Sequence, residues 1–366
     1  MKKTISIILV LALGLTAEVA KADFIFGTAI PVPNVNISLP GTSNAENSSD
    51  GLSLYFSCQQ SGGYGSTDIW VATRETTDGD WGTPVNLGTP VNSSAYDGQP
   101  SISADSLELY FADGAHGNTG PYRSGGHGGS DLWVSRRATT NDPWAEPVNL
   151  GPIVNSWASD SDPEISADGL MLFFHSDCPG GYGDTDLWVT KRPTKDSPWA
   201  EPVNLGPTIN TGIYDGDPDI SADGLTLFFC NYGRADTYGG ADLYLTRRAT
   251  TSDLWEEPVN LGPIVNSSVH DSDPTISPDG STLYLASNRP GGPGDWNIWQ
   301  ASIIPIVDLN ENGIVDAADM CIMVDHWGEN YSLCDIGPTP LGDGIVDVQD
   351  LIVLAENLFK TISPVE

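Results

Sequence analysis

The octapeptide WAEPVNLG occupies residues 144–151 and recurs without change at residues 199–206. Near-copies flank this pair, with WGTPVNLG at residues 81–88 and WEEPVNLG at residues 255–262. A single core gives no reason to repeat one strand-sized phrase at steps of 55 to 63 residues, whereas an array of equivalent units does. The phrase therefore predicts a repeat fold. Its proline suits an outer edge strand of each unit, because proline cannot donate to a central ladder.

The segments between these copies each contain three further strand-like runs. A D-G or D-S turn between two β-rich runs predicts a hairpin, and such turns lie in SISADSLELYF (101–111), EISADGLMLFF (164–174), DISADGLTLFF (219–229) and TISPDGSTLYL (275–285). A third strand is predicted in DIWVATR (68–74), DLWVSRR (131–137), DLWVTKR (186–192) and DLYLTRR (242–248). With the octapeptide as the fourth strand, each unit is predicted to be one blade of a β-propeller.

Five copies of the first three strands begin near residues 49, 101, 164, 219 and 275, but only four octapeptides follow a third strand. The missing outer strand has a candidate in FGTAIPVPNVN (26–36), which has a similar P-V-x-N core. We therefore expect an all-β fold over residues 23–304. It is a five-bladed β-propeller of four-stranded antiparallel blades, closed by an N-terminal strand.

The S-x-D-G, L-Y-F, G-G-x-G and D-L-W elements, together with SNRPGG at residues 287–292, resemble the WD-like propeller repeats of the TolB type in exported bacterial proteins. The resemblance covers most of residues 49–303. It implies a fold but no activity, because such propellers serve as docking platforms, ligand binders and accessory domains of enzymes.

The N-terminal residues and the charge limit the location and the partners. Lys2 and Lys3 precede a short apolar run, and A-K-A at residues 20–22 is typical of a secretory cleavage site. We expect residues 1–22 to be a signal peptide, and the mature protein to be secreted, either extracellular or bound at the cell surface, with the periplasm as another possibility. The apolar run is too short to span a bilayer, so no membrane insertion is expected. A net charge of −34 argues against nucleic acid as a partner.

Two insertions between the second and third strands break the repeat, at residues 114–129 and 231–240. Tyrosine and arginine side chains there suit stacking and hydrogen bonding to a polysaccharide or peptide ligand. A plain surface loop is the alternative. The candidate ligand-binding residues are His116, Tyr122, Arg123, Tyr232 and Arg234.

Carboxylates that recur in every blade are predicted to be structural, since an active site needs a unique constellation. The pairs Asp160/Asp162, Asp215/Asp217 and Asp271/Asp273 are different, because they enter the innermost strand beside the central channel. A ring of carboxylates there could hold a cation. We assign no catalytic residue from the sequence.

The stretch DLNENGIVDAAD (308–319) has oxygen-bearing residues at positions 1, 3, 5, 9 and 12 of a calcium loop and glycine at position 6. The predicted ligands are Asp308, Asn310, Asn312, the Ile314 carbonyl, Asp316 and Asp319. GIVDVQD (344–350) repeats GIVDAAD (313–319), but an insertion places Thr339 and Leu341 at positions 1 and 3, so a weaker second site is expected. Its predicted ligands are Asp343, Ile345, Asp347 and Asp350, with Asp335 reaching in.

Two such EF-hand-like loops, each leading into a helix and ending in aspartate, resemble a type I dockerin module over residues 305–360, followed by a tail at residues 361–366. The resemblance implies a small α-helical domain, calcium as the cofactor, and a cohesin-like domain or scaffold protein as the partner. Positions 10 and 11 hold Ala317-Ala318 and Val348-Gln349 instead of a hydroxyl pair, which leaves the cohesin partner open. Cys321 and Cys334 could form a disulfide within this module.

Three functions remain open from the sequence. We favour a secreted, non-catalytic propeller that binds a ligand or protein partner, with polysaccharide as one candidate, and that is tethered by a calcium-dependent dockerin–cohesin interaction. The alternative is a five-bladed, polysaccharide-active glycoside hydrolase attached to a scaffold by its dockerin. The third is a purely structural surface protein.

Overall fold

The computed structural model describes residues 24–36, 41–59, 62–115, 122–310, 312, 314–329, 331–337, 341–342 and 344–359. The predicted signal peptide, His116, Asp343 and the C-terminal tail lie outside the described residues. Among the described helices, none is long and apolar enough to cross a membrane.

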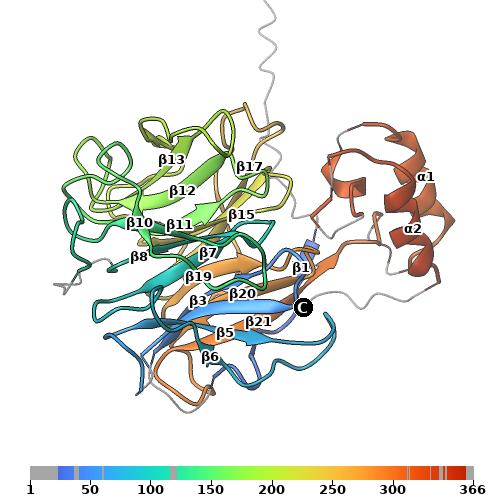
Figure 1. Cartoon of the computed structure of the whole chain (residues 1–366). Coiled ribbons are helices and arrows are strands. Elements are labelled where there is room, and N and C mark those ends of the chain that lie inside the picture. The colour runs from blue at the N-terminus through green and yellow to red at the C-terminus, as the bar shows by residue number, and fades with distance from the viewer. Residues whose placement is uncertain are drawn as a thin grey trace, which may run out of the picture.

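The described residues form five antiparallel sheets arranged as the blades of a propeller (Figure 1), which confirms the predicted fold class. Blade 1 contains β3 (Thr42–Asn47), β4 (Ser53–Cys58), β5 (Asp68–Thr73) and β6 (Val85–Asn86); blade 2 contains β7 (Gly98–Ile102), β8 (Glu108–Ala112), β9 (Leu132–Arg136) and β10 (Val148–Asn149). Blade 3 contains β11 (Asp160–Ile165), β12 (Met171–Ser176), β13 (Asp186–Lys191) and β14 (Val203–Asn204); blade 4 contains β15 (Tyr214–Ile220), β16 (Thr226–Tyr232), β17 (Asp242–Arg247) and β18 (Val259–Asn260). Blade 5 contains β19 (Asp271–Ile276), β20 (Thr282–Ser287) and β21 (Asn297–Pro305).

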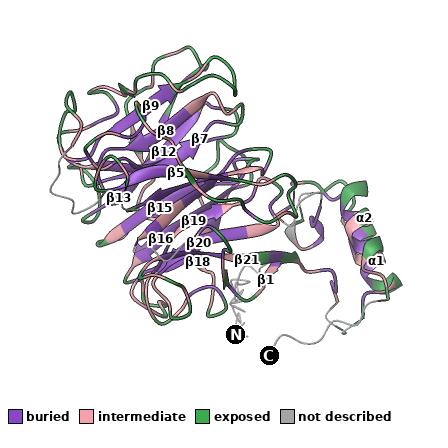
Figure 2. Ribbon diagram, turned by 60° about the horizontal axis from the view of Figure 1, so that its bottom comes forward, coloured by how far each residue is buried: buried purple, intermediate pink, exposed green. Residues whose placement is uncertain are grey.

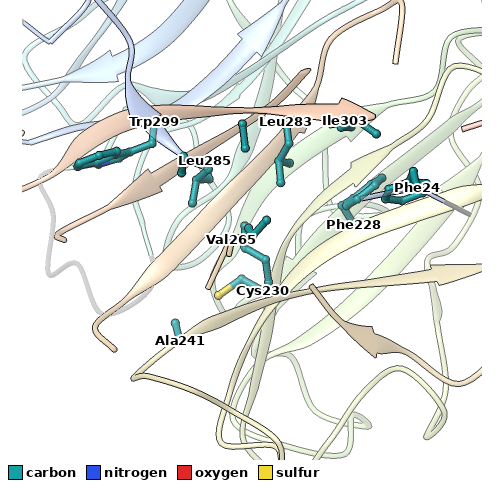
Figure 3. Close-up of a cluster of buried hydrophobic side chains, with 12 residues drawn as sticks. Phe24, Phe228, Cys230, Ala241, Val265, Leu283, Leu285, Trp299 and Ile303 are labelled. Atoms are coloured by element: carbon teal, nitrogen blue, oxygen red, sulfur yellow. The ribbon is translucent and has the colours of Figure 1, made fainter. Parts of the chain in front are cut away.

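The N-terminal segment closes the ring, as the sequence predicts. β1 (Phe24–Phe26) and β2 (Ile30–Pro31) both pair antiparallel with β21, in the place of the missing outer strand. Val32 and Val35 then pack into the core between blades 5 and 1. Figure 3 shows Phe24 beside Phe228 of β16 and near Ile303 of β21, so the first described residue joins the hydrophobic cluster between blades 4 and 5.

Blade 1 begins earlier than the sequence pattern indicates. Its innermost strand, β3, begins at Thr42, seven residues before the predicted start near residue 49, and residues 49–51 form the turn. The strand reads TSNAEN and so lacks the D-x-D-P phrase that marks the same strand in blades 3, 4 and 5.

The tryptophan of each octapeptide lies in the seam between its own blade and the preceding one. Trp255 of blade 4 contacts Phe173 of blade 3 edge-on, and Trp199 of blade 3 contacts Tyr110 of blade 2. An arginine from the end of the third strand lies 4.2–4.4 Å from each indole centroid, in the pairs Arg74–Trp81, Arg137–Trp144, Arg192–Trp199 and Arg248–Trp255. Such cation–π contacts contribute about 0.5–2 kcal/mol each. The tryptophan of the repeated phrase therefore packs neighbouring blades against each other.

Aspartate at the start of the third strand joins the strands within a blade. Asp68 accepts hydrogen bonds from the backbone N–H groups of Tyr64 and Gly65 and from the side chain of Asn86 in β6. Asp186 and Asp242 accept the corresponding bonds in blades 3 and 4. These recurrent aspartates are structural, as predicted. Figure 2 shows the resulting pattern of buried inner strands and exposed loops.

Two nine-residue helices follow the propeller, α1 (Ala317–Asp325) and α2 (Val348–Glu356), with a short 3₁₀ turn η1 (Ser332–Cys334) between them. They lie beside the propeller in Figure 1 and share a small apolar core that includes Val315, Met323, Val346 and Leu354. Cys321 is exposed, Cys334 is buried, and both are free thiols, so the possible disulfide between them is not formed.

Candidate functional site

Each of the five innermost strands carries one bulge at the same position. The bulged residues have φ values of 49–57°, and they are Asn44, Gln99, Asp162, Asp217 and Asp273. Asparagine and aspartate enter this left-handed region more readily than most residues, but a non-glycine residue there still costs about 1–3 kcal/mol. Five such residues at one level of the channel mark it as a functional candidate, because strain of this kind clusters at functional sites.

These five side chains form a network across the channel, which we call the polar ring. The Asn44 side-chain amide donates to Asp162 Oδ1 and to Asp273 Oδ1, both at 2.9 Å. Gln99 Nε2 donates to Asp162 Oδ2 at 2.6 Å, and the backbone N–H of Asp273 donates to Asp217 Oδ2 at 3.4 Å. Asn44 and Asp162 come from blades that are not neighbours, so the ring spans the channel.

A histidine that the sequence analysis did not single out completes the ring. His175 Nδ1 lies 3.3 Å from Asp162 Oδ2 and 3.7 Å from Asp217 Oδ1, and the side chain is almost fully buried. The register of β12 and β13 shows that the other blades place smaller residues at this position, namely Ser57, Ala112, Cys230 and Ala286. A histidine at a position that the other blades fill with smaller residues was the sequence feature that could have identified His175 as a site residue.

Burial controls the charge of the polar ring. It raises the pKa of the Asp162 carboxyl well above its usual range, and the nearby Asp217 and Asp273 raise it further. Burial also raises the pKa of Asp217 and of Asp273. The ring therefore favours neutral carboxyls, since three charges cannot share this dry site without a compensating positive charge or proton donor.

A cavity of about 590 Å³ borders the polar ring, and its volume is within the size range of small-molecule sites. Its lining combines the polar ring and His175 with aromatic side chains, which are Tyr96, Tyr214, Tyr232 and Trp296. Gly98 and Gly216 make room for two of these rings. A Cβ at Gly98 would lie 2.8 Å from Cε1 of Tyr96, and one at Gly216 would lie 2.5 Å from the Tyr214 hydroxyl.

Of the five predicted ligand-binding residues, Tyr232 lines the cavity, and it packs edge-on against Tyr214. Arg123 instead forms an ion pair with Asp97, with 2.6 Å between Nε and Oδ1, and donates to the Val91 carbonyl. Arg234 similarly donates to the Ile209 carbonyl. Tyr122 is half-buried in the blade 2 insertion, and His116 lies outside the described residues.

Arg123 and Arg234 lie in the loop that follows the second strand of their blade. Each hydrogen-bonds the segment that leads into the innermost strand of the same blade, at Val91 and at Ile209. Arg289 of blade 5 repeats the arrangement, since it bonds Asp271 and the Val265 carbonyl. Their guanidinium groups also lie over buried aromatic rings, 5.1 Å from Phe111 for Arg123 and 5.3 Å from Tyr244 for Arg234. These contacts engage Arg123 and Arg234 within the fold, away from the cavity lining.

The first predicted calcium loop is wrapped by its own side-chain oxygens. Asp319 is fully buried, and its carboxylate accepts from the backbone N–H groups of Asn310 and Asp316. Asp308 accepts from the Asn312 backbone N–H, and Asn312 accepts from that of Ile314. Asp316 caps α1. The donor set is all oxygen, which fits calcium.

The second loop repeats this pattern across its insertion. Asp350 accepts from the Ile336 and Gly337 backbone N–H groups, as Asp319 accepts from Asn310. Asp335 accepts from the Gly344 N–H at 2.7 Å, so its carboxylate reaches into the loop across the insertion. Asp347 caps α2, Ile345 is exposed, and Asp343 lies outside the described residues.

No protein-family model and no curated protein matches this chain. Among solved structures, it is similar to TolB from Acinetobacter baumannii (TM-score 0.44, 12% identity, 73% of this chain and 55% of that chain). It is also similar to the catalytic domain of a GH62 α-L-arabinofuranosidase from Coprinopsis cinerea (TM-score 0.48, 12% identity, 77% of this chain and 97% of that one) and to an endo-arabinase from Bacteroides thetaiotaomicron (0.46, 14%, 76% and 97%). The chain spans about half the length of the TolB structure. What these proteins share with it is the propeller fold.

Proposed function

We propose that this protein is a secreted, non-catalytic binding protein whose propeller takes a short saccharide in the channel cavity. The observation that carries the proposal is the cavity lining, which sets aromatic rings beside a ring of carboxyl and amide groups. Aromatic faces stack on the apolar faces of sugars, while carboxylates and amides exchange hydrogen bonds with hydroxyl groups. Both kinds of contact converge on one space of about 590 Å³.

The alternative is a glycoside hydrolase of the same fold, and one observation favours it. Buried carboxyls with raised pKa values gather in a cavity, as they do in many active sites. However, a glycosidase needs one carboxyl to donate a proton and another to act as nucleophile or base. Here all six carboxylate oxygens of Asp162, Asp217 and Asp273 already lie within hydrogen-bonding reach of protein donors. These protein contacts disfavour use of any one carboxyl as a proton donor or nucleophile, while the second lone pair of each oxygen can still accept from a sugar hydroxyl, which supports binding over catalysis.

The C-terminal module would tether the protein to a partner. The shared hydrogen-bond pattern of the two loops supports calcium binding at Asp308, Asn310, Asn312, Ile314, Asp316 and Asp319, and at Asp335, Ile345, Asp347 and Asp350. The sequence spacing adds Asp343, which lies outside the described residues, to the second set. Calcium would supply the positive charge that holds these carboxylates together. Ala317-Ala318 and Val348-Gln349 are exposed at the helix starts and would face a cohesin-like domain or scaffold.

The test is a glycan array read together with a hydrolysis assay on the same purified protein. We expect binding to short saccharides without release of reducing sugar. Trp296→Ala should abolish binding, because it removes an aromatic wall of the cavity. The matched control is Trp157→Ala, whose side chain is 72% exposed. Hydrolysis of a bound glycan would favour the alternative, and equal binding by the Trp296 variant would place the site elsewhere.

A further inference from the structure

A second cavity, of about 230 Å³, lies further along the inner strands, at the end of the channel that carries the D-G turns. Four acidic residues line it, and three of them, Glu46, Glu164 and Asp219, come from the innermost strands of blades 1, 3 and 4. One carboxylate oxygen from each of these three lies within 4.8 Å of the other two. Each residue is 5–8% exposed, so this acidic cluster is almost enclosed by the fold.

The cluster belongs to a level of the channel that offers oxygen atoms alone. Strand register makes five positions equivalent, each paired with an aromatic residue of the second strand, and these are Glu46, Ser101, Glu164, Asp219 and Thr275. The Ser101 hydroxyl already donates to Glu164 at 2.9 Å. The three carboxylates form a donor set for a hard cation, in contrast to the polar ring with its imidazole.

No cationic side chain neutralises the acidic cluster among the described residues, because none of the ion pairs found there involves Glu46, Glu164 or Asp219. Burial and mutual repulsion raise the pKa of Glu46 and of Glu164. Like charges this close in a site with little water repel strongly. A bound cation would offset that repulsion.

Asn47 provides an independent observation. The other four blades place isoleucine at its position, where Ile102, Ile165, Ile220 and Ile276 line the same cavity. Asn47 is only 7% exposed, and neither atom of its amide has a hydrogen-bond partner among the described residues. A buried amide without partners destabilises the folded state, and isoleucine would avoid that cost. The repeat therefore departs from isoleucine where an extra oxygen would face this cavity.

We infer that Glu46, Glu164 and Asp219 bind one hard divalent cation of the calcium class at this end of the channel, with Asn47 as an additional polar group. Calcium takes six to eight oxygen ligands, so water would complete the shell. Leu341 and Gly342 of the second C-terminal loop also line this cavity, but none of that loop's predicted ligands among the described residues does, and the site is distinct from the first loop and from the saccharide cavity. It would join three blades through one ion.

The experiment is calorimetric titration of CaCl₂ into full-length protein stripped of metal with a chelator. The Asp308→Ala/Asp319→Ala protein serves as the background, because it lacks the predicted ligands of the first C-terminal loop. We expect this background protein to retain a calcium-binding step that Glu164→Gln weakens at least about tenfold, by removing a charged ligand. Glu146→Gln, at an exposed acid on the outside of blade 2, is the control.

Two results would overturn the inference. One is a background protein without a calcium step, and the other is equal affinity in the Glu164→Gln and Glu146→Gln proteins. Asn47→Ile is a second variant that should fold well, because it restores the residue of the other blades. It should melt at a higher temperature without calcium and bind calcium more weakly. A higher melting temperature with unchanged calcium affinity would remove Asn47 from the site.

Discussion

Asn44 and Asp162 meet across the channel, where the asparagine amide of blade 1 donates to the aspartate carboxylate of blade 3 at 2.9 Å. The same amide also donates to Asp273 of blade 5, so one side chain holds two acids from two other blades. This relationship fixes the spacing of the polar ring, which forms part of the lining of the 590 Å³ cavity.

Asn44→Ala should destabilise the propeller. The change removes both amide bonds and leaves two buried carboxyls with fewer donors, which we expect to cost about 2–4 kcal/mol of the free energy of unfolding. Urea denaturation followed by tryptophan fluorescence measures this loss. Asn141→Ala, at an exposed turn in blade 2, is the control and should change little. Equal midpoints for the two variants would show that the amide does not stabilise the ring.

Arg123→Ala should reduce stability before it affects any ligand. The variant leaves the buried Asp97 carboxylate without its cationic partner. Breaking a buried ion pair typically costs about 3–5 kcal/mol of the free energy of unfolding. We therefore expect a clear drop in melting temperature by calorimetry. Arg136→Ala is the control, because its ion pair with Glu108 is half exposed. If Arg123→Ala keeps its melting temperature but loses glycan binding, Arg123 acts directly on the ligand.

Asp113→Asn should make the protein more stable at neutral pH. Burial raises the pKa of Asp113 to about 6, above its value of about 3.9 in an unfolded chain. The native state then binds more protons between these two values, so the free energy of unfolding falls as pH rises through about 4 to 6 and stays lower above it. Blade 4 already carries asparagine at the equivalent position, Asn231.

Thermal melts at pH 4 and pH 7.5 check the predicted direction of the change in stability. Asp113→Asn should raise the melting temperature at pH 7.5 and change it little at pH 4. Asp50→Asn is the opposite case, because a hydrogen bond from Ser48 lowers the pKa of Asp50. Its stabilising contribution is present above the unfolded pKa, so this variant should lose stability at pH 7.5. The same response from both variants would refute the assignment.

Asp308→Ala with Asp319→Ala should remove the tighter of two calcium-binding steps assigned to the C-terminal loops. Three carboxylates at Asp308, Asp316 and Asp319 repel one another unless a cation lies between them, so metal binding and folding of this loop should be coupled. Chelation of the wild-type protein should therefore reduce its helical circular dichroism. The double variant should show no such change from the first loop.

Asp325→Ala, at an exposed position on α1, is the control for this pair. Helical content that is identical with and without chelator in the wild-type protein would contradict calcium binding at both loops. A tight step that survives the double change, and that Glu164→Gln does not remove, would contradict the assignment of the first loop.

The repeat made the architecture readable from the sequence. Blade number, strand order and closure by the N-terminal segment all follow from local phrases whose spacing is regular, since strands and hairpins are encoded by nearby residues. Blade 1 was partly missed because TSNAEN keeps the strand but lacks the phrase. The calcium loops stay a prediction, which rests on a ligand spacing that is nearly continuous in sequence.

The recurring D-x-D-P phrase placed Asp162, Asp217 and Asp273 beside the channel from the sequence, but the tertiary structure decided the rest of the channel. Asn44, Gln99 and Asp162 look unrelated in sequence, but identical bulges in three blades bring their side chains to one level. Arg123 and Arg234 were predicted from the sequence to bind a ligand. In the structure, Arg123 pairs with the buried Asp97 carboxylate and Arg234 donates to the Ile209 carbonyl. A propeller channel joins residues dozens to hundreds of positions apart, and small shifts in strand register decide which side chains face it, so local patterns specified the aspartates of the repeated phrase but not the whole site.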